Sequence, residues 1–239
     1  MINDKNVLAI IPARSGSKGL TNKNLMLLNG LPLVVWSINA AVNSKFIDKV
    51  VVSTDSPEIQ RVAVQNGAES PILRPKELST DESLTYEAVE HVITYYKNSL
   101  SEQFDLIVLL EPTSPLRTSE DIDNSILKLI NHSTATSLVG VGRCETQHPD
   151  FLVRISADGL ISSFSNFRLE AKPRQSISKV FFLDGSIYIS KVESLIFFRS
   201  FYQENTIAFE FPKWKNFEID DYVDFLIVEK LLDNEARLN

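Results

Sequence analysis

The sequence predicts an α/β fold with a Rossmann-like, mostly parallel sheet that carries helices on both faces. Its 239 residues suffice for one large domain. Short aliphatic runs alternate with helical patterns over the first 143 residues. Several of these runs are apolar at every position, which is typical of strands that are buried on both faces of a parallel sheet. Strand–helix alternation of this kind favours a sheet covered by helices on each side.

The individual elements follow from apolar runs and from their start and stop signals. Pro57 fits the first turn of a helix that Gly67 terminates, and Ser119 is expected to cap another helix. Strands are expected over residues 7–11, 49–53, 105–110, 136–141 and 180–189, and helices over residues 33–42, 57–66, 84–97, 119–130, 191–202 and 222–232.

The alternation of strand and helix patterns is interrupted between residues 145 and 180. This stretch is polar, is interrupted by Pro149, Gly159 and Pro173, and contains only short β-like pieces such as residues 160–164. We therefore predict a single α/β domain over residues 1–239, with residues 145–180 forming an insertion or small subdomain on it.

Composition excludes several functional classes. A net charge of −7 argues against a nucleic-acid partner, because phosphate neutralisation requires a basic surface. Aliphatic runs such as residues 106–110 are too short to cross a membrane. Cys144 is the single cysteine, so neither an internal disulfide nor a structural zinc site is expected. The first residues lack the pattern of a signal peptide, and we expect a cytoplasmic protein.

A glycine-rich and cationic loop follows the first predicted strand, where ligands of open α/β sheets bind. It contains Gly16 and Gly19 together with Arg14, Lys18 and Lys23. Glycine lets backbone N–H groups approach phosphate oxygens, and the cations offset phosphate charge. The spacing is neither that of a P-loop nor that of a dinucleotide-binding loop. The loop therefore predicts an anion site of another type, unless its lysines are merely solvated.

Four ordered segments resemble the acylneuraminate cytidylyltransferases, the CMP-sialic acid synthetase family. The first combines Ile-Pro-Ala-Arg at residues 11–14 with Ser-Lys-Gly at 17–19 and Lys-Asn at 23–24. The others are Leu-Arg-Pro-Lys-Glu-Leu-Ser at residues 73–79, followed by Asp81 and Thr85; Leu-Glu-Pro-Thr-Ser-Pro-Leu-Arg at residues 110–117; and Glu-Ile-Asp at residues 218–220, with Asp224 beyond. The resemblance extends over residues 7–232.

The resemblance implies transfer of CMP from CTP to the anomeric hydroxyl of a nonulosonic, sialic-acid-like sugar, with Mg²⁺ as cofactor. It implies catalytic roles for Arg14, Lys18, Lys23 and Asp220. Nucleotide contacts are implied for Ala13, Arg14, Gly16, Ser17, Lys23, Asn24, Arg74, Ser83 and Thr85. Sugar contacts are implied for Glu111, Thr113, Ser114, Arg174 and Asp184, and metal contacts for Glu218 and Asp220, which would share a face if they lay in a strand.

Departures from the family pattern concentrate on the implied sugar side. Glu111 stands where the family usually has Gln, and Asp184 where it often has Asn. Asp150 and Phe151 follow a His-Pro pair where some members carry a lysine. This asymmetry predicts CTP chemistry with a different acceptor, such as a diamino nonulosonate of the legionaminic or pseudaminic type.

Alternatives remain open at this point. An eight-carbon 3-deoxy-octulosonate could be the acceptor, although its enzymes lack this Ser-Gly-Ser-Lys-Gly run. The protein could instead bind nucleotide sugars without catalysis. Asp55 could orient the loop cations, or it could simply begin a helix, as could the acidic cluster at Asp220, Asp221 and Asp224. The resemblance finally implies a homodimer in which residues 145–180 contact the second subunit.

Overall fold

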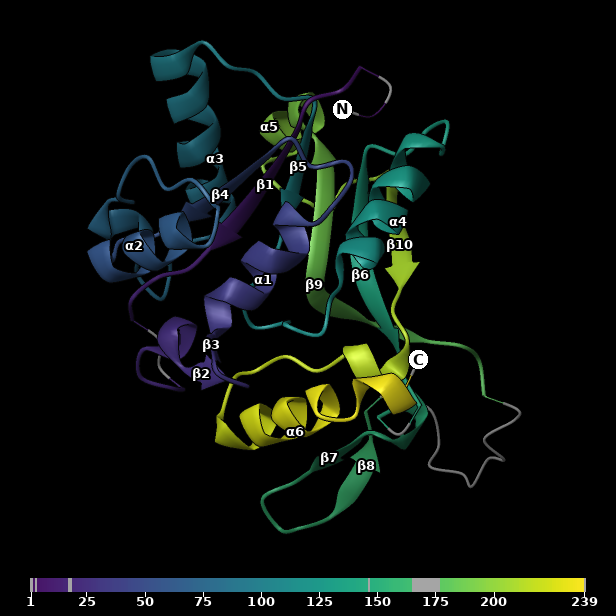
Figure 1. Ribbon diagram of the computed structural model, residues 1–239. Coiled ribbons are helices and arrows are strands. Elements are labelled where there is room, and N and C mark those ends of the chain that lie inside the picture. Colours follow the sequence, from purple (N-terminus) through teal and green to yellow (C-terminus); the bar gives the residue numbers. More distant parts are fainter. Residues whose placement is uncertain (1, 3, 17–18, 146, 165–176, 239) are drawn as a thin grey trace.

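A six-stranded sheet forms the centre of the molecule in a computed structural model, which describes residues 2, 4–16, 19–145, 147–164 and 177–238 (Figure 1). The strand order is β10-β6-β9-β5-β1-β4. The strands are β1 (Val7–Pro12), β4 (Lys49–Ser53), β5 (Leu106–Leu109), β6 (Ser137–Arg143), β9 (Phe181–Lys191) and β10 (Thr206–Glu210). Only β9 runs antiparallel to its sheet neighbours, β5 and β6, so the expected mostly parallel sheet is confirmed.

Helices cover both faces of this sheet. They are α1 (Leu33–Val42), α2 (Pro57–Gln65), α3 (Thr85–Tyr95), α4 (Ser119–Ile130), α5 (Val192–Phe198) and α6 (Tyr222–Leu232). Alternate residues of β1 enter different cores: Val7 and Ala9 pack with α1, α2 and α4, whereas Leu8 and Ile10 pack with α3 and α5. This alternation follows from the two-residue period of a strand. Helix α6 packs in a third cluster with Leu28 of a short hairpin, β2 (Leu27–Leu28) and β3 (Leu31–Pro32).

The cap of one helix and the C-terminal ends of two others show the main differences from the sequence prediction. Thr118, not Ser119, caps α4, because its hydroxyl accepts from the Asp121 N–H and the Asp121 carboxylate accepts in return. Helix α3 passes into a π-helical turn (Tyr96–Leu100) instead of continuing to residue 97 as an α-helix. Helix α5 stops at Phe198 because Arg199 adopts a left-handed conformation with φ of 50°.

Part of the 145–180 segment leaves the sheet as a separate hairpin. After a turn at Pro149–Phe151, strands β7 (Val153–Ile155) and β8 (Ile161–Ser163) pair only with each other. In Figure 1 the hairpin extends below α6, away from the sheet. Residues 165–176, including Pro173, lie outside the described residues.

The described helices are all too short or too polar to cross a bilayer.

Candidate active site

The candidate site lies at the edge where β1, β4 and β5 end. Arg14 follows β1, Asp55 follows β4, and Glu111 follows β5. The Ala13 N–H donates to the Ser53 carbonyl at 2.9 Å, which continues the β1–β4 pairing into the loop. Because parallel strands end together at this edge, residues from three distant segments meet there. Asn24 joins them by donating its side-chain amide to the Arg14 carbonyl at 3.0 Å.

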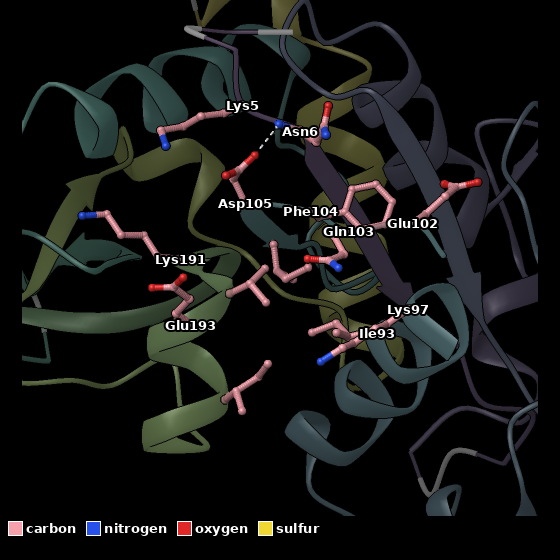
Figure 2. Close-up of a pocket in the computed structure, with 13 residues that line it drawn as sticks. Lys5, Asn6, Ile93, Lys97, Glu102, Gln103, Phe104, Asp105, Lys191 and Glu193 are labelled. Atoms are coloured by element: carbon pink, nitrogen blue, oxygen red, sulfur yellow. Dashed lines mark hydrogen bonds between the residues drawn. The ribbon is translucent and has the colours of Figure 1, made fainter. Parts of the chain in front are cut away.

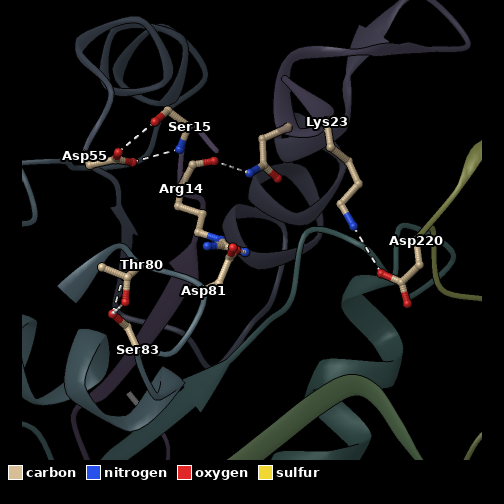
Figure 3. Close-up of polar contacts among 9 residues, drawn as sticks. Arg14, Ser15, Lys23, Asp55, Thr80, Asp81, Ser83 and Asp220 are labelled. Atoms are coloured by element: carbon tan, nitrogen blue, oxygen red, sulfur yellow. Dashed lines mark hydrogen bonds and ion pairs between the residues drawn. The ribbon is translucent and has the colours of Figure 1, made fainter. Parts of the chain in front are cut away.

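Asp55 anchors the glycine-rich loop. Its carboxylate accepts from the Ser15 N–H at 2.8 Å and from the Ser15 hydroxyl at 2.7 Å (Figure 3). Ser56, the next residue, caps α2 by accepting from the Glu58 and Ile59 N–H groups. Burial alone would raise the pKa of Asp55, but the bonds from Ser15, with help from Arg74, lower it below its ordinary value. The interpretation of Asp55 as a helix-start residue was therefore wrong, and it is a loop-positioning residue.

Lys23 connects the loop to the acidic segment near the C-terminus. Its ammonium group donates to the Ile219 carbonyl at 2.8 Å and to Asp220 Oδ1 at 3.1 Å (Figure 3). Gly19 makes the same approach possible, because a Cβ atom there would lie 2.1 Å from the Asp220 carbonyl oxygen. The Ile219 N–H donates to the Thr113 carbonyl at 2.8 Å, which ties the acidic segment to the loop after β5. Segments 196 residues apart thus share one site.

The acidic segment is not the strand that would place its carboxylates on one face. Residues 216–220 are irregular, and they connect a short 3₁₀ turn (Lys213–Lys215) to α6. Glu218 is half-buried and accepts from the Gly185 N–H at 2.6 Å, whereas 79% of the Asp220 side chain is exposed. Burial raises the pKa of Glu218, and the nearby carboxylates of Asp184 and Asp220 raise it further. The hydrogen bond from Gly185 and the charge of Lys23 act in the opposite direction. Asp221 caps α6, so that part of the helix-start interpretation is confirmed.

A cavity of about 220 Å³ opens beside Arg14 and Arg74. Arg14 forms an ion pair of 2.7 Å with Asp81 on its wall. The cavity is lined by Pro12, Arg14, Arg74, Leu78, Thr80, Asp81, Ser83, Leu84, Thr85 and Glu111. Ser83 supports the wall by donating to the Glu77 carbonyl at 3.0 Å, and Thr85 begins α3. The predicted nucleotide residues Arg14, Arg74, Ser83 and Thr85 therefore meet at one cavity.

Arg74 is buried there with unsatisfied donors. It is 7% exposed, and its Nε and Nη2 atoms have no hydrogen-bond partner within the described residues. Burial lowers the pKa of Arg74, and the nearby Arg14 adds to this shift. The carboxylates of Asp55 and Glu111 act in the opposite direction. A buried guanidinium with free N–H groups is costly unless an acceptor arrives. Arg74 is accordingly prepared for a ligand oxygen or nitrogen.

Glu111 is half-buried at the same cavity. Burial and the neighbouring Glu218 raise its pKa to about 7, although Arg117, Arg74 and Lys23 act in the opposite direction. Near neutral pH this group therefore exists in both forms. The protonated form can donate a hydrogen bond, whereas the ionised form can only accept.

The other predicted sugar residues occupy different environments. Asp184 is 1% exposed, and its two oxygens accept from the Ser186 N–H at 2.7 Å and the Asn216 side chain at 2.5 Å. Ser114 is also buried, with no partner for its hydroxyl within the described residues. Thr113 contributes its carbonyl to the acidic segment. Ser17, Lys18 and Arg174 lie outside the described residues, and Gly16 has open space around its Cα.

Sequence reasoning did not identify Arg117 as a site residue, although it connects three segments of the site. This buried side chain donates to the Ser186 carbonyl and, at 2.7 Å, to the Ser37 hydroxyl. It thereby links the loop after β5 to β9 and α1. Burial lowers its pKa to about 10, while Asp184, Asp121 and Glu111 resist the change. Its place at the end of the Pro-Thr-Ser-Pro-Leu-Arg run was the available signal.

Glu111→Gln is expected to flatten the pH dependence of stability. In the wild type the carboxyl pKa rises from 4.5 to about 7 on folding, so the folded state binds more protons than the unfolded chain between these values. The free energy of unfolding therefore falls as pH rises through this window, by about 1–3 kcal/mol. Urea unfolding at pH 5 and pH 8 measures the difference. An identical decrease in the variant would remove Glu111 as its source.

Comparisons with known proteins identify the family of the chain. A family model described as cytidylyltransferase matches residues 8–165. The chain is 36% identical over 229 residues to the CMP-N,N'-diacetyllegionaminic acid synthase of Legionella pneumophila, covering 95% of this chain and 96% of the relative. It is 33% identical over 231 residues to the N-acylneuraminate cytidylyltransferase of Escherichia coli O18:K1:H7, covering 97% of this chain. The chain spans only 53% of that second relative's length.

A solved structure shares the fold. CMP:2-keto-3-deoxy-manno-octonic acid synthetase complexed with CTP superimposes with a TM-score of 0.69, at 17% identity, covering 96% of this chain and 99% of the other. The sheet topology and the cation-rich loop are consistent with the family match, and the chain belongs to the cytidylyltransferase family.

Proposed function

We propose that the protein transfers CMP from CTP to the anomeric 2-hydroxyl of a nonulosonic acid and releases pyrophosphate. The observation that carries this proposal is the meeting of Lys23 and Asp220 at the edge where Arg14 and Arg74 face a cavity. The names of both relatives described above specify cytidylyl transfer to, or CMP activation of, such sugars.

The reaction is a displacement at the α-phosphorus of CTP. The sugar oxygen forms a bond to that phosphorus, the bond to the β-phosphate oxygen breaks, and the hydroxyl proton is released. Catalysis of this kind depends on alignment and on stabilising phosphate charge. Lys23 supplies a point charge from beneath the loop, and Arg14 can hold two oxygens at once. Lys18 and the backbone of Gly16 and Ser17 are proposed to complete the phosphate contacts.

The cavity beside Arg74 is proposed to hold the base and ribose. The unsatisfied Nε and Nη2 donors of Arg74 suit acceptors such as the O2 and N3 atoms of cytosine. Thr85 and the loop around Ser83 also line this cavity. The Asn24 side chain donates a hydrogen bond to the Arg14 carbonyl, so Asn24 is proposed to act on the nucleotide by positioning Arg14.

A divalent metal, Mg²⁺ in our proposal, fits the acidic segment. Within the described residues no set of three potential ligands forms a complete metal cage. Mg²⁺ commonly takes one or two carboxylates and completes its shell with phosphate oxygens and water. Asp220 is exposed, and Glu218 lies close enough to Asp184 and Asp220 for mutual repulsion to raise its pKa, a situation that a cation relieves. When bound, the metal would neutralise charge on the phosphates.

Glu111 is proposed to select a diamino acceptor sugar. An ionised carboxylate accepts hydrogen bonds from N–H groups, and a nonulosonate with two acylamino groups offers one more such donor than N-acetylneuraminate. Turnover should be compared for N,N'-diacetyllegionaminate, a pseudaminate, N-acetylneuraminate and 3-deoxy-octulosonate, with CTP and the other nucleoside triphosphates. We expect a diamino sugar and CTP to give the highest kcat/KM, by about tenfold or more.

Glu111→Gln is the matched variant for this test. It is expected to shift kcat/KM toward N-acetylneuraminate, because the amide replaces a carboxyl that is partly an ionised acceptor by a neutral group that always also donates. A wild-type preference for N-acetylneuraminate would refute the diamino assignment. Absence of pyrophosphate release with every sugar, despite CTP binding, would instead support a catalytically silent binding protein.

A homodimer and a cytoplasmic location complete the proposal. The β7–β8 hairpin exposes Ile155, Leu160 and Ile161 at 72%, 69% and 62%, and a second copy of the chain would cover such apolar side chains. Sedimentation equilibrium tests the dimer, since a monomer at micromolar concentration would exclude it. Fractionation of native cells tests the location.

A further inference from the structure

Helix α3 extends from the candidate active site to a second cavity. Its N-cap, Leu84, and its first residue, Thr85, line the cavity of about 220 Å³ beside Arg74. Near its other end, Ile93 lines a cavity of about 490 Å³ at the amino ends of β1 and β5 (Figure 2). The lining of this second cavity carries three lysines and three carboxylates, a balance that favours neither sign of ligand charge. Between the two cavities, α3 carries His91.

Arg74 and Ser53 project from the face of the sheet that α3 covers. Val51 of β4 packs in one cluster with residues of α3, and Ser53, two residues further along the strand, has the same orientation. Leu73 pairs with Thr54 in a parallel bridge, and the Arg74 N–H donates to the Thr54 carbonyl at 2.7 Å. Because successive residues of an extended chain alternate between faces, Arg74 lies on the same side as Ser53.

His91 lies on the face of α3 that is turned toward this part of the sheet. It follows Leu84 by seven residues and Ala88 by three, so the three residues share one face of the helix. Leu84 lines the cavity, and Ala88 is buried. Burial lowers the pKa of His91, and the charge of Arg74 lowers it further, so the imidazole is neutral near pH 7. The Nδ1 atom of this ring is buried without a hydrogen-bond partner among the described residues.

Donors and acceptors in this layer are complementary. The unsatisfied Nε and Nη2 atoms of Arg74 carry three N–H groups between them, and the unsatisfied Ser53 hydroxyl can donate or accept. The O2 and N3 atoms of cytosine would take two of the three N–H groups, which leaves one. The unprotonated Nδ1 of a neutral imidazole can only accept. A buried donor and a buried acceptor that lack partners each cost free energy, and a hydrogen bond between them removes both costs.

We propose that His91 is a positioning residue for Arg74, whose guanidinium donates one hydrogen bond to Nδ1 of His91, directly or through one water, and turns its other N–H groups toward the nucleotide base. This role rests on the proposed binding of cytosine beside Arg74. With the acceptor in place, the guanidinium is held in one orientation before the nucleotide arrives, so less ordering accompanies binding.

Two substitutions at His91 separate the acceptor from the volume of the ring. His91→Leu removes the acceptor, and we expect the Kd for CTP with Mg²⁺, measured by titration calorimetry, to rise about three- to tenfold. His91→Asn places an amide oxygen near the position of Nδ1 and should restore the Kd to within about twofold of the wild type. Thr94→Ala, at an exposed position of the same helix, is the control and should match the wild type. Thermal melts verify the folding of each variant.

A double-mutant cycle shows whether His91 acts through Arg74. Arg74→Met should weaken CTP, and adding His91→Leu to it should have no further effect, because the group that His91 positions is gone. Equal weakening by His91→Leu in both backgrounds would mean that His91 only supports the fold, and it would overturn the proposal. Unchanged CTP affinity in His91→Leu would overturn it as well. A wild type that does not bind CTP would instead refute the proposed function itself, before any substitution is compared.

The imidazole of the wild-type protein provides a test that depends on no variant at His91. The chain has three histidines, so their ring nitrogens can be resolved by ¹⁵N spectroscopy. At pH 7.5 we expect His91 to show an unprotonated Nδ1 with the shift of a hydrogen-bond acceptor, and we expect this shift to be lost in Arg74→Met. A protonated Nδ1, or a shift that Arg74→Met leaves unchanged, would overturn the proposal.

Discussion

Lys23→Ala is expected to lower the rate of pyrophosphate release by about 10²–10³-fold, because it removes a preorganised charge from the developing phosphate oxygens. The same change deletes the contacts of 2.8 Å to Ile219 and 3.1 Å to Asp220, so the acidic segment also loses its link to the loop. Single-turnover measurements with CTP, Mg²⁺ and the preferred nonulosonate give the rate.

Two controls separate charge from general disruption. Lys23→Arg retains the charge with different geometry and should fall between the wild type and the alanine variant. Lys213→Ala removes an exposed lysine that pairs with Glu145 at 2.7 Å, and its rate should match the wild type. If Lys23→Ala retained more than a third of the wild-type rate, Lys23 would serve only to hold the acidic segment, and the proposed phosphate site would be misplaced.

Gly19→Ala is the second change with a large expected effect. The new methyl group would lie 2.1 Å from the backbone carbonyl oxygen of Asp220, and backbone cannot rotate away as a long side chain can. Either the loop or the acidic segment must move, which separates Lys23 from its partners. A displacement of about 1 Å at such a site can cost about 10²-fold in rate, and overpacking costs roughly 1–3 kcal/mol of stability.

Gly16→Ala is the matched control in the same loop. A Cβ atom at Gly16 would meet nothing within 4 Å, so this variant should keep the wild-type urea-unfolding midpoint, and it is a control for overpacking alone. The urea-unfolding midpoint should be recorded for both variants. An equal loss of stability at the two positions would mean that loop flexibility, and not the approach of Gly19 to Asp220, is the cause.

Much of the fold could be predicted from local pattern. The helices at Leu33–Val42 and Tyr222–Leu232 and the strand at Lys49–Ser53 begin and end where the sequence indicates. Strand β10 (Thr206–Glu210) was missed because it lies at the sheet edge and its side chains are half-exposed or exposed, which leaves no continuous apolar run. Its position depends on parallel pairing with β6, a contact between residues about 70 positions apart.

The candidate site was likewise predicted only in part from the sequence. The resemblance to the family implied that Arg14, Lys23, Arg74 and Thr85 are nucleotide residues. The structure places Arg14, Arg74 and Thr85 at one cavity, and Lys23 contacts Asp220 of the acidic segment. The sequence could not decide between the two roles considered for Asp55, and it did not indicate the role of Arg117. Each depends on a partner supplied by a different segment: Ser15 for Asp55, Ser37 and Ser186 for Arg117.

The sequence by itself determined the alternation of strands and helices, the chemistry of the loop and the identity of its cations, because these depend on residue type and on neighbours a few positions away. Tertiary structure alone decided that Asp220 meets Lys23, that Glu218 turns inward toward Gly185, and that Glu111 is buried enough to titrate near neutral pH. The physical reason is that close approach and desolvation arise only when segments distant in sequence pack together, and no local pattern encodes which segments those will be.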